Sequence, residues 1–162
     1  MRYSDLENCI KEIAASSSET ARHHFAHDTI RRLHQSAVEA ISKELTDSER
    51  RLLTELLAGL DSQPAEGLKA KLNDLTDSMC RDPVRAIEFH ADITELLCAI
   101  DSWIDYRRTA DAEHIFGIAI AMVNSVDYAI GGDTADYSVK NMLGASEMRE
   151  EFERQQHLLM GD

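Results

Sequence analysis

Glycine, proline and cysteine are scarce in this sequence, with seven, two and three residues in a chain of 162. So few turn-forming residues argue against an all-β fold and against a disordered chain. The cysteines are odd in number and form no Cys-x-x-Cys motif, so we expect reduced thiols that serve as small core residues. The start of the chain, with Asp5 and Glu7, does not resemble a secretory signal. These features predict a cytoplasmic protein.

Basic residues are also few. Seventeen Lys and Arg face thirty Asp and Glu, which gives a formal net charge of −13. This charge repels phosphate backbones and argues against a nucleic-acid-binding module. It favours a partner with a basic surface. The alternative that the acidity serves solubility alone, in a non-enzymatic helical adaptor, stays open at this stage.

The common motifs of enzyme active sites are absent from the sequence. It contains no GxxxxGK[ST], GxGxxG or GxSxG string, so phosphate-binding loops and nucleophile elbows are not predicted. Thirty carboxylates offer no means of selecting an acid–base pair by position alone. We expect a protein that is not an enzyme, with no catalytic residue and no cofactor.

Apolar residues recur at helical spacing through most of the chain, and no segment alternates long enough to predict a strand. The predicted fold is all-α: a single compact domain over 1–162, with six to eight helices around a buried central helix at 115–130. Charged and polar residues interrupt that helix, so we do not expect it to cross a membrane. The expected helices are 4–15, a long helix through 41, a helix from Thr46 to about 60, one from Pro64 to 81, one from Asp82 through about 105, 115–130, and a last one capped by Ser146 that ends near 159.

Histidines cluster near the start of the second predicted helix. His23 and His27 lie four residues apart and share one helical face, one turn after Glu19. Zinc needs three or four ligands, and no second cluster at suitable spacing follows, so we assign no metal ligand. Whether His23 and His27 bind a metal stays open.

The dipeptide His27-Asp28 resembles the signature of HD-domain phosphohydrolases, which are all-helical and metal-dependent. This resemblance implies, as the alternative to a binding protein, a hydrolase that uses His23, His27 and Asp28. The family places another ligand histidine upstream on an earlier helix, and this chain has none before His23.

Two adjacent glycines, Gly131 and Gly132, follow the apolar run and predict the C-terminal cap of that helix. Carboxylates and aromatic rings come next, a combination that suits an interface with a basic protein. The alternative is that the tyrosines pack over the edge of the core. The predicted partner-binding residues are Asp133, Asp136 and Tyr137, beside Tyr128, with Asp101 and Asp105 as a second group.

The segment "ELLCAIDSWIDYRRTADAEHIFGIAIAMVNSVDYAIGG", continued by "DYSVKNMLGASEMREEFERQQHLL", resembles the C-terminal half of small helical immunity proteins. These belong to bacterial toxin–immunity systems, including contact-dependent growth inhibition. The pattern is Asp-Tyr-x-x-Gly-Gly, then Asp-Tyr-Ser and a terminal amphipathic helix. The resemblance implies a protein that binds a cognate toxin domain, often a nuclease, and blocks its active site.

Overall fold

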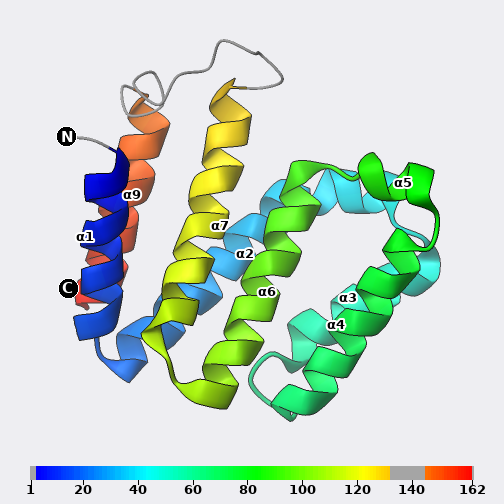
Figure 1. Ribbon diagram of the computed structural model, residues 1–162, viewed down its shortest axis with the longest axis horizontal. Helices are drawn as coiled ribbons and strands as arrows, with labels where there is room; N and C mark the ends of the chain where they lie inside the picture. Colours follow the sequence, from blue (N-terminus) through cyan, green and yellow to red (C-terminus); the bar gives the residue numbers. More distant parts are fainter. Residues whose placement is uncertain (1–2, 132–144, 162) are drawn as a thin grey trace.

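The structure is a computed structural model that describes residues 3–131 and 145–161. Within these ranges every regular element is a helix, which confirms the predicted all-α class (Figure 1). The helices are α1 (Tyr3–Ser16), α2 (Glu19–Glu44), α3 (Asp47–Gly59), α4 (Ala65–Cys80), α5 (Pro83–Ile87), α6 (Ala91–Thr109), α7 (Ala112–Gly131) and α9 (Ser146–Met160).

Short-range hydrogen bonds fix several helix starts. Thr46 and Glu49 form the expected capping box of α3: the Thr46 hydroxyl accepts from the Glu49 N–H, and the Glu49 carboxylate accepts from the Thr46 N–H at 2.9 Å. Asp82 caps α5, with Pro83 in its first turn. At the last helix the prediction was wrong. Ala145 takes the capping position, and Ser146 is the first helical residue.

The single helix expected from Asp82 through about 105 is two helices in the structure. α5 ends at Ile87, and α6 begins at Ala91 after His90. Long-range contacts explain the break. Glu44, at the end of α2, accepts from the His90 backbone N–H with its carboxylate and from Arg85 with its backbone carbonyl. In a continuous helix the His90 N–H would bond to the carbonyl of Ala86 and would not be free to donate to Glu44.

The helices pack around one core (Figure 1). α2 crosses behind α6 and α7, with α1 and α9 on one side and α3 and α4 on the other. α6 and α7 form the most extensive contact between two helices, followed by α2 and α6. Trp103 is fully buried there together with Phe25 and Leu33.

Helix α7 occupies the central position that its apolar sequence predicts. It packs against α1, α2, α6 and α9. It is also long and apolar enough to cross a membrane by length and composition alone, as core helices of soluble proteins can be. Asn124 and Tyr128 stay exposed and mark its outer side.

The expectation that cysteines would serve as core residues was wrong. Cys9 is half-buried, and Cys80 and Cys98 are exposed. Cys98 lies between the buried residues Leu97 and Ala99 in sequence but points to the outer side of α6. A rotation of about a hundred degrees per residue is enough to carry a small side chain from the core to the surface.

Candidate functional site

The partner-binding residues predicted from the sequence fall into two groups. Asp133, Asp136 and Tyr137 lie outside the described residues. Asp101 and Asp105 lie one turn apart on α6 and share a cation, Lys69 of α4. The Lys69 ammonium is hydrogen-bonded to Asp101, and its nitrogen is 3.7 Å from Oδ1 of Asp105.

The cations beside Asp101 and Asp105 leave little free negative charge on this part of α6. Arg108 is also 3.5 Å from Asp105 and 3.0 Å from Glu66. The hydrogen bond with Asp101 raises the pKa of Lys69, so the ammonium stays charged. A cationic partner would have to compete with Lys69 and Arg108 for these carboxylates.

A second group of carboxylates, which the sequence did not identify as a candidate site, lies where α6 begins and α7 ends. On the α6 side, Asp92 accepts from Ser125 at 2.8 Å and Glu95 accepts from Asn124 at 3.3 Å. Burial raises the pKa of Glu95; the hydrogen bond from Asn124 opposes this shift, and the Asp92 charge adds to it. Like charges are therefore crowded on this side of α7.

The α1 side of the same helix end is acidic as well. The pKa of Tyr3 is raised to about 12, chiefly by burial and in part by the Glu7 carboxylate and the charge of Asp127. The C-terminus of a helix adds partial negative charge of its own. We call Glu7, Asp92, Glu95 and Asp127 the acidic end of α7.

An aromatic ring borders the acidic end. Tyr128 is 36% exposed, and its ring packs edge-on against His90 with the ring centroids 5.3 Å apart. A partly exposed tyrosine next to carboxylates is a suitable contact for a protein partner.

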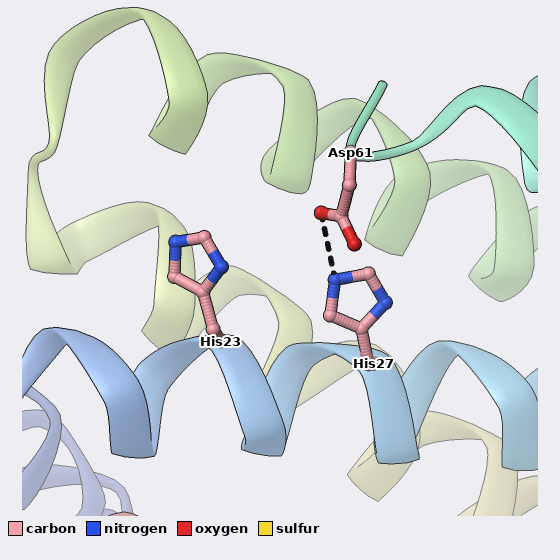
Figure 2. A group of neighbouring side chains, drawn as sticks. All are labelled: His23, His27 and Asp61. Carbon is pink, nitrogen blue, oxygen red and sulfur yellow. Dashed lines mark hydrogen bonds and ion pairs between the residues drawn. The ribbon is translucent and has the colours of Figure 1, made fainter. Parts of the chain in front are cut away.

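The histidines of α2 form a separate cluster with a residue that the sequence did not identify. His23 and His27 lie one turn apart, and Asp61, which follows α3, joins them (Figure 2). Nε2 of His27 is 2.9 Å from Oδ1 of Asp61. One ligand atom from each residue lies within 4.8 Å of the others. Asp61 is 34 positions from His27, and only tertiary structure brings the two together.

The carboxylate of Asp28 is engaged elsewhere. It accepts from Arg31 at 2.6 Å, from Arg32 at 2.9 Å and from Arg154 of α9 at 2.7 Å. Burial raises its pKa, but the hydrogen bonds from Arg31 and Arg32 and the Arg154 charge lower it overall. Asp28 is thus an anchor for α9, and the His27-Asp28 dipeptide does not form one metal-ligand group in the described part of the chain.

The cluster adjoins an open cleft of about 740 Å³ between α2 and α3. His27 contributes to both. The cleft mixes apolar surface from α3 with imidazole and guanidinium groups from α2, among them His24, Arg31 and His34. A small molecule could therefore reach His27 through this cleft.

The chain matches no protein-family model, no curated protein and no solved structure. The resemblances to immunity proteins and to HD-domain phosphohydrolases therefore stay predictions from the residues quoted for them.

Proposed function

We propose that this protein is an immunity protein. It would bind a cognate bacterial toxin domain that has a basic surface, such as a nuclease, and would block the toxin's active site in the cytoplasm. The observation that carries the proposal is the net charge of −13 together with the acidic end of α7. The proposal needs no catalytic group in this chain.

Electrostatics supports this role for the acidic end. A nuclease must bind a polyanion, so its cleft is cationic and complementary to a surface of carboxylates. Complementary charge can raise the association rate constant toward ~10⁸ M⁻¹s⁻¹ at low salt. Lys and Arg of the partner would also relieve the crowding of Glu95 and Asp92, which destabilises the free protein.

We place the contact surface at the acidic end of α7, with Tyr128 as its aromatic member. Asp133, Asp136 and Tyr137 directly follow α7 in the sequence and remain proposed contacts. Asp101 and Asp105 are ranked below them because Lys69 and Arg108 already pair with their carboxylates.

The test begins with the gene immediately upstream, which we expect to encode a large secreted protein, and it uses the C-terminal domain of that protein together with this chain. Stopped-flow association at low and high salt should give a fast reaction that slows steeply as salt increases. The double variant Glu95→Gln with Asp92→Asn should associate several-fold more slowly at low salt, because two steering charges are lost. The toxin domain's nuclease activity should fall in proportion to complex formation.

Asp74 and Asp77 provide the matched control. Both are exposed on α4, and their change to Asn removes the same charge from another face. We expect this control to associate like the wild type. Equal slowing of both double variants would place the interface elsewhere, and the absence of binding with unimpaired toxin activity would overturn the proposed function.

A further inference from the structure

The cluster of His23, His27 and Asp61 has the donor set of a transition-metal site. Two imidazoles and one carboxylate converge from two elements, and their ligand atoms lie within 4.8 Å of one another (Figure 2). Imidazole suits Zn²⁺, Cu²⁺, Fe²⁺ and Ni²⁺, whereas Mg²⁺ and Ca²⁺ prefer oxygen ligands alone. The donor set therefore selects a first-row transition metal.

The ligand positions need only a small adjustment to hold such an ion. Zinc ligands lie about 2.0–2.2 Å from the metal, so neighbouring ligand atoms are about 3.5 Å apart in a tetrahedral site. The side chains of His23 and Asp61 are 43% and 60% exposed and can rotate by this amount. Glu19, one turn before His23, has an oxygen 3.9 Å from His23 Nε2 and can orient this ring.

Trp103 packs against the cluster from the core side. Its ring contacts both histidines edge-on, with centroid distances of 4.8 Å to His23 and 5.1 Å to His27. Its indole N–H donates to the carbonyl oxygen of Leu60, the residue before Asp61, at 3.1 Å. One buried side chain thus orients both rings and the backbone of the third ligand, as an arranged metal site requires.

The surrounding charge also favours a cation. Asp61 and Glu19 are the two carboxylates at the cluster, and the acidic chain raises the local concentration of cations. Two guanidinium groups lie near the cluster. That of Arg31 on α2 is paired with Asp28 at 2.6 Å, and that of Arg107 on α6, which borders a pocket with Glu19 and His23, donates to the carbonyls of Leu60 and Gln63. Repulsion from Arg31 is correspondingly reduced.

We infer that His23, His27 and Asp61 bind one divalent first-row transition-metal ion of the Zn²⁺ class. Three protein ligands leave at least one coordination position open toward the adjoining cleft, for water or a small ligand. This site is separate from the acidic end of α7 and does not rest on toxin binding.

Metal binding is measured on the full chain after treatment with a chelator and its removal. Titration calorimetry with ZnCl₂ in a phosphine reductant should show one ion per chain. Co²⁺ and Ni²⁺ should quench the fluorescence of Trp103, the chain's only tryptophan. No heat and no quenching up to millimolar metal would overturn the inference, and so would a thiolate-to-cobalt absorption band, which would place the ion on a cysteine.

Variants locate the ion. His23→Gln and Asp61→Asn should each weaken metal binding by at least about tenfold. Loss of a residue that only orients a ligand already weakens binding by about 10- to 100-fold. His24→Gln and His34→Gln are the matched controls, since both remove an imidazole from α2 beside the same cleft. None of the four side chains is fully buried, and thermal melts will verify folding. Equal loss in the control variants would refute the assigned ligands.

Discussion

Trp103 donates its indole N–H to the backbone carbonyl of Leu60 across 3.1 Å. This hydrogen bond joins the middle of α6 to the residue that follows α3. Arg107 donates to the same carbonyl at 2.9 Å, and to that of Gln63 at 2.6 Å. The turn between α3 and α4 is therefore held by two side chains of α6.

Replacing Trp103 by Phe should destabilise the protein by about 2 kcal/mol, because a hydrogen bond and part of a buried ring are lost. Arg107→Met should have a smaller effect while Trp103 still satisfies the Leu60 carbonyl. The double variant leaves that buried carbonyl without a side-chain donor, so its loss should exceed the sum of the single losses. Urea denaturation measures all three; additive losses would show that the two donors act independently.

Protonation of Glu49 should destabilise the protein in acid. This buried carboxylate binds Arg85, Ser78 and the Thr46 N–H, and the hydrogen bonds from Arg85 chiefly lower its pKa from 4.5 to about 2. A depressed folded-state pKa stabilises the protein above about pH 4.5, and the stabilisation is lost as the pH falls toward 2. Glu49→Gln should cost about 3 kcal/mol at pH 7 and flatten the stability profile between the two pKa values. An unchanged acid slope would contradict the predicted shift.

Glu95 should have the opposite effect. Its raised pKa means that the folded protein binds the proton more tightly than the unfolded chain, so ionisation destabilises the fold as the pH rises above the ordinary value of 4.5. Glu95→Gln should therefore raise the melting temperature at pH 7, and the gain should vanish below about pH 3.5. Asp77→Asn, at an exposed site of α4, is the control. A lower melting temperature for Glu95→Gln at pH 7 would disprove the predicted sign.

The close approach of α6 and α7 can be tested at Gly117. A Cβ added there would lie 2.8 Å from the Ser102 hydroxyl oxygen and 3.4 Å from the Ser102 Cβ. Alanine in place of glycine in a helix gains about 1 kcal/mol. That gain should appear when Gly117→Ala is made on a Ser102→Ala background and should be smaller, by about 1 kcal/mol, in the wild type. Denaturation of the wild type, the two single variants and the double variant gives the coupling energy between Gly117 and Ser102. A coupling energy of zero would show that the Ser102 side chain rotates away freely.

The sequence predicted the features that depend on neighbouring residues. The capping box of Thr46 and Glu49 needs only a short fixed spacing, and the apolar run that became α7 needs only periodicity. The end of α5 was missed because its cause is distant: Glu44 contacts Arg85 and His90 from another helix. The exposure of Cys98 depends on how α6 is rotated in the bundle.

The same distinction applies to the candidate sites. His23 and His27 were visible as a pair because one helix carries both. Asp61 became their neighbour only through the packing of α3 against the core, in which Trp103 takes part. The sequence identified Asp101 and Asp105 as candidate contacts but could not identify Lys69, 32 residues before Asp101, as their cation.

The charge on α6 changes sign along its length, from Asp92 and Glu95 at its start to Arg107 and Arg108 in its last turn. The two ends of the helix therefore differ in the sign of their charge. A cationic patch that arrives in one orientation is drawn to the first turns, and in the reversed orientation it meets guanidinium groups. The partner's orientation would then be selected during the diffusional encounter, before side-chain contacts form across the interface.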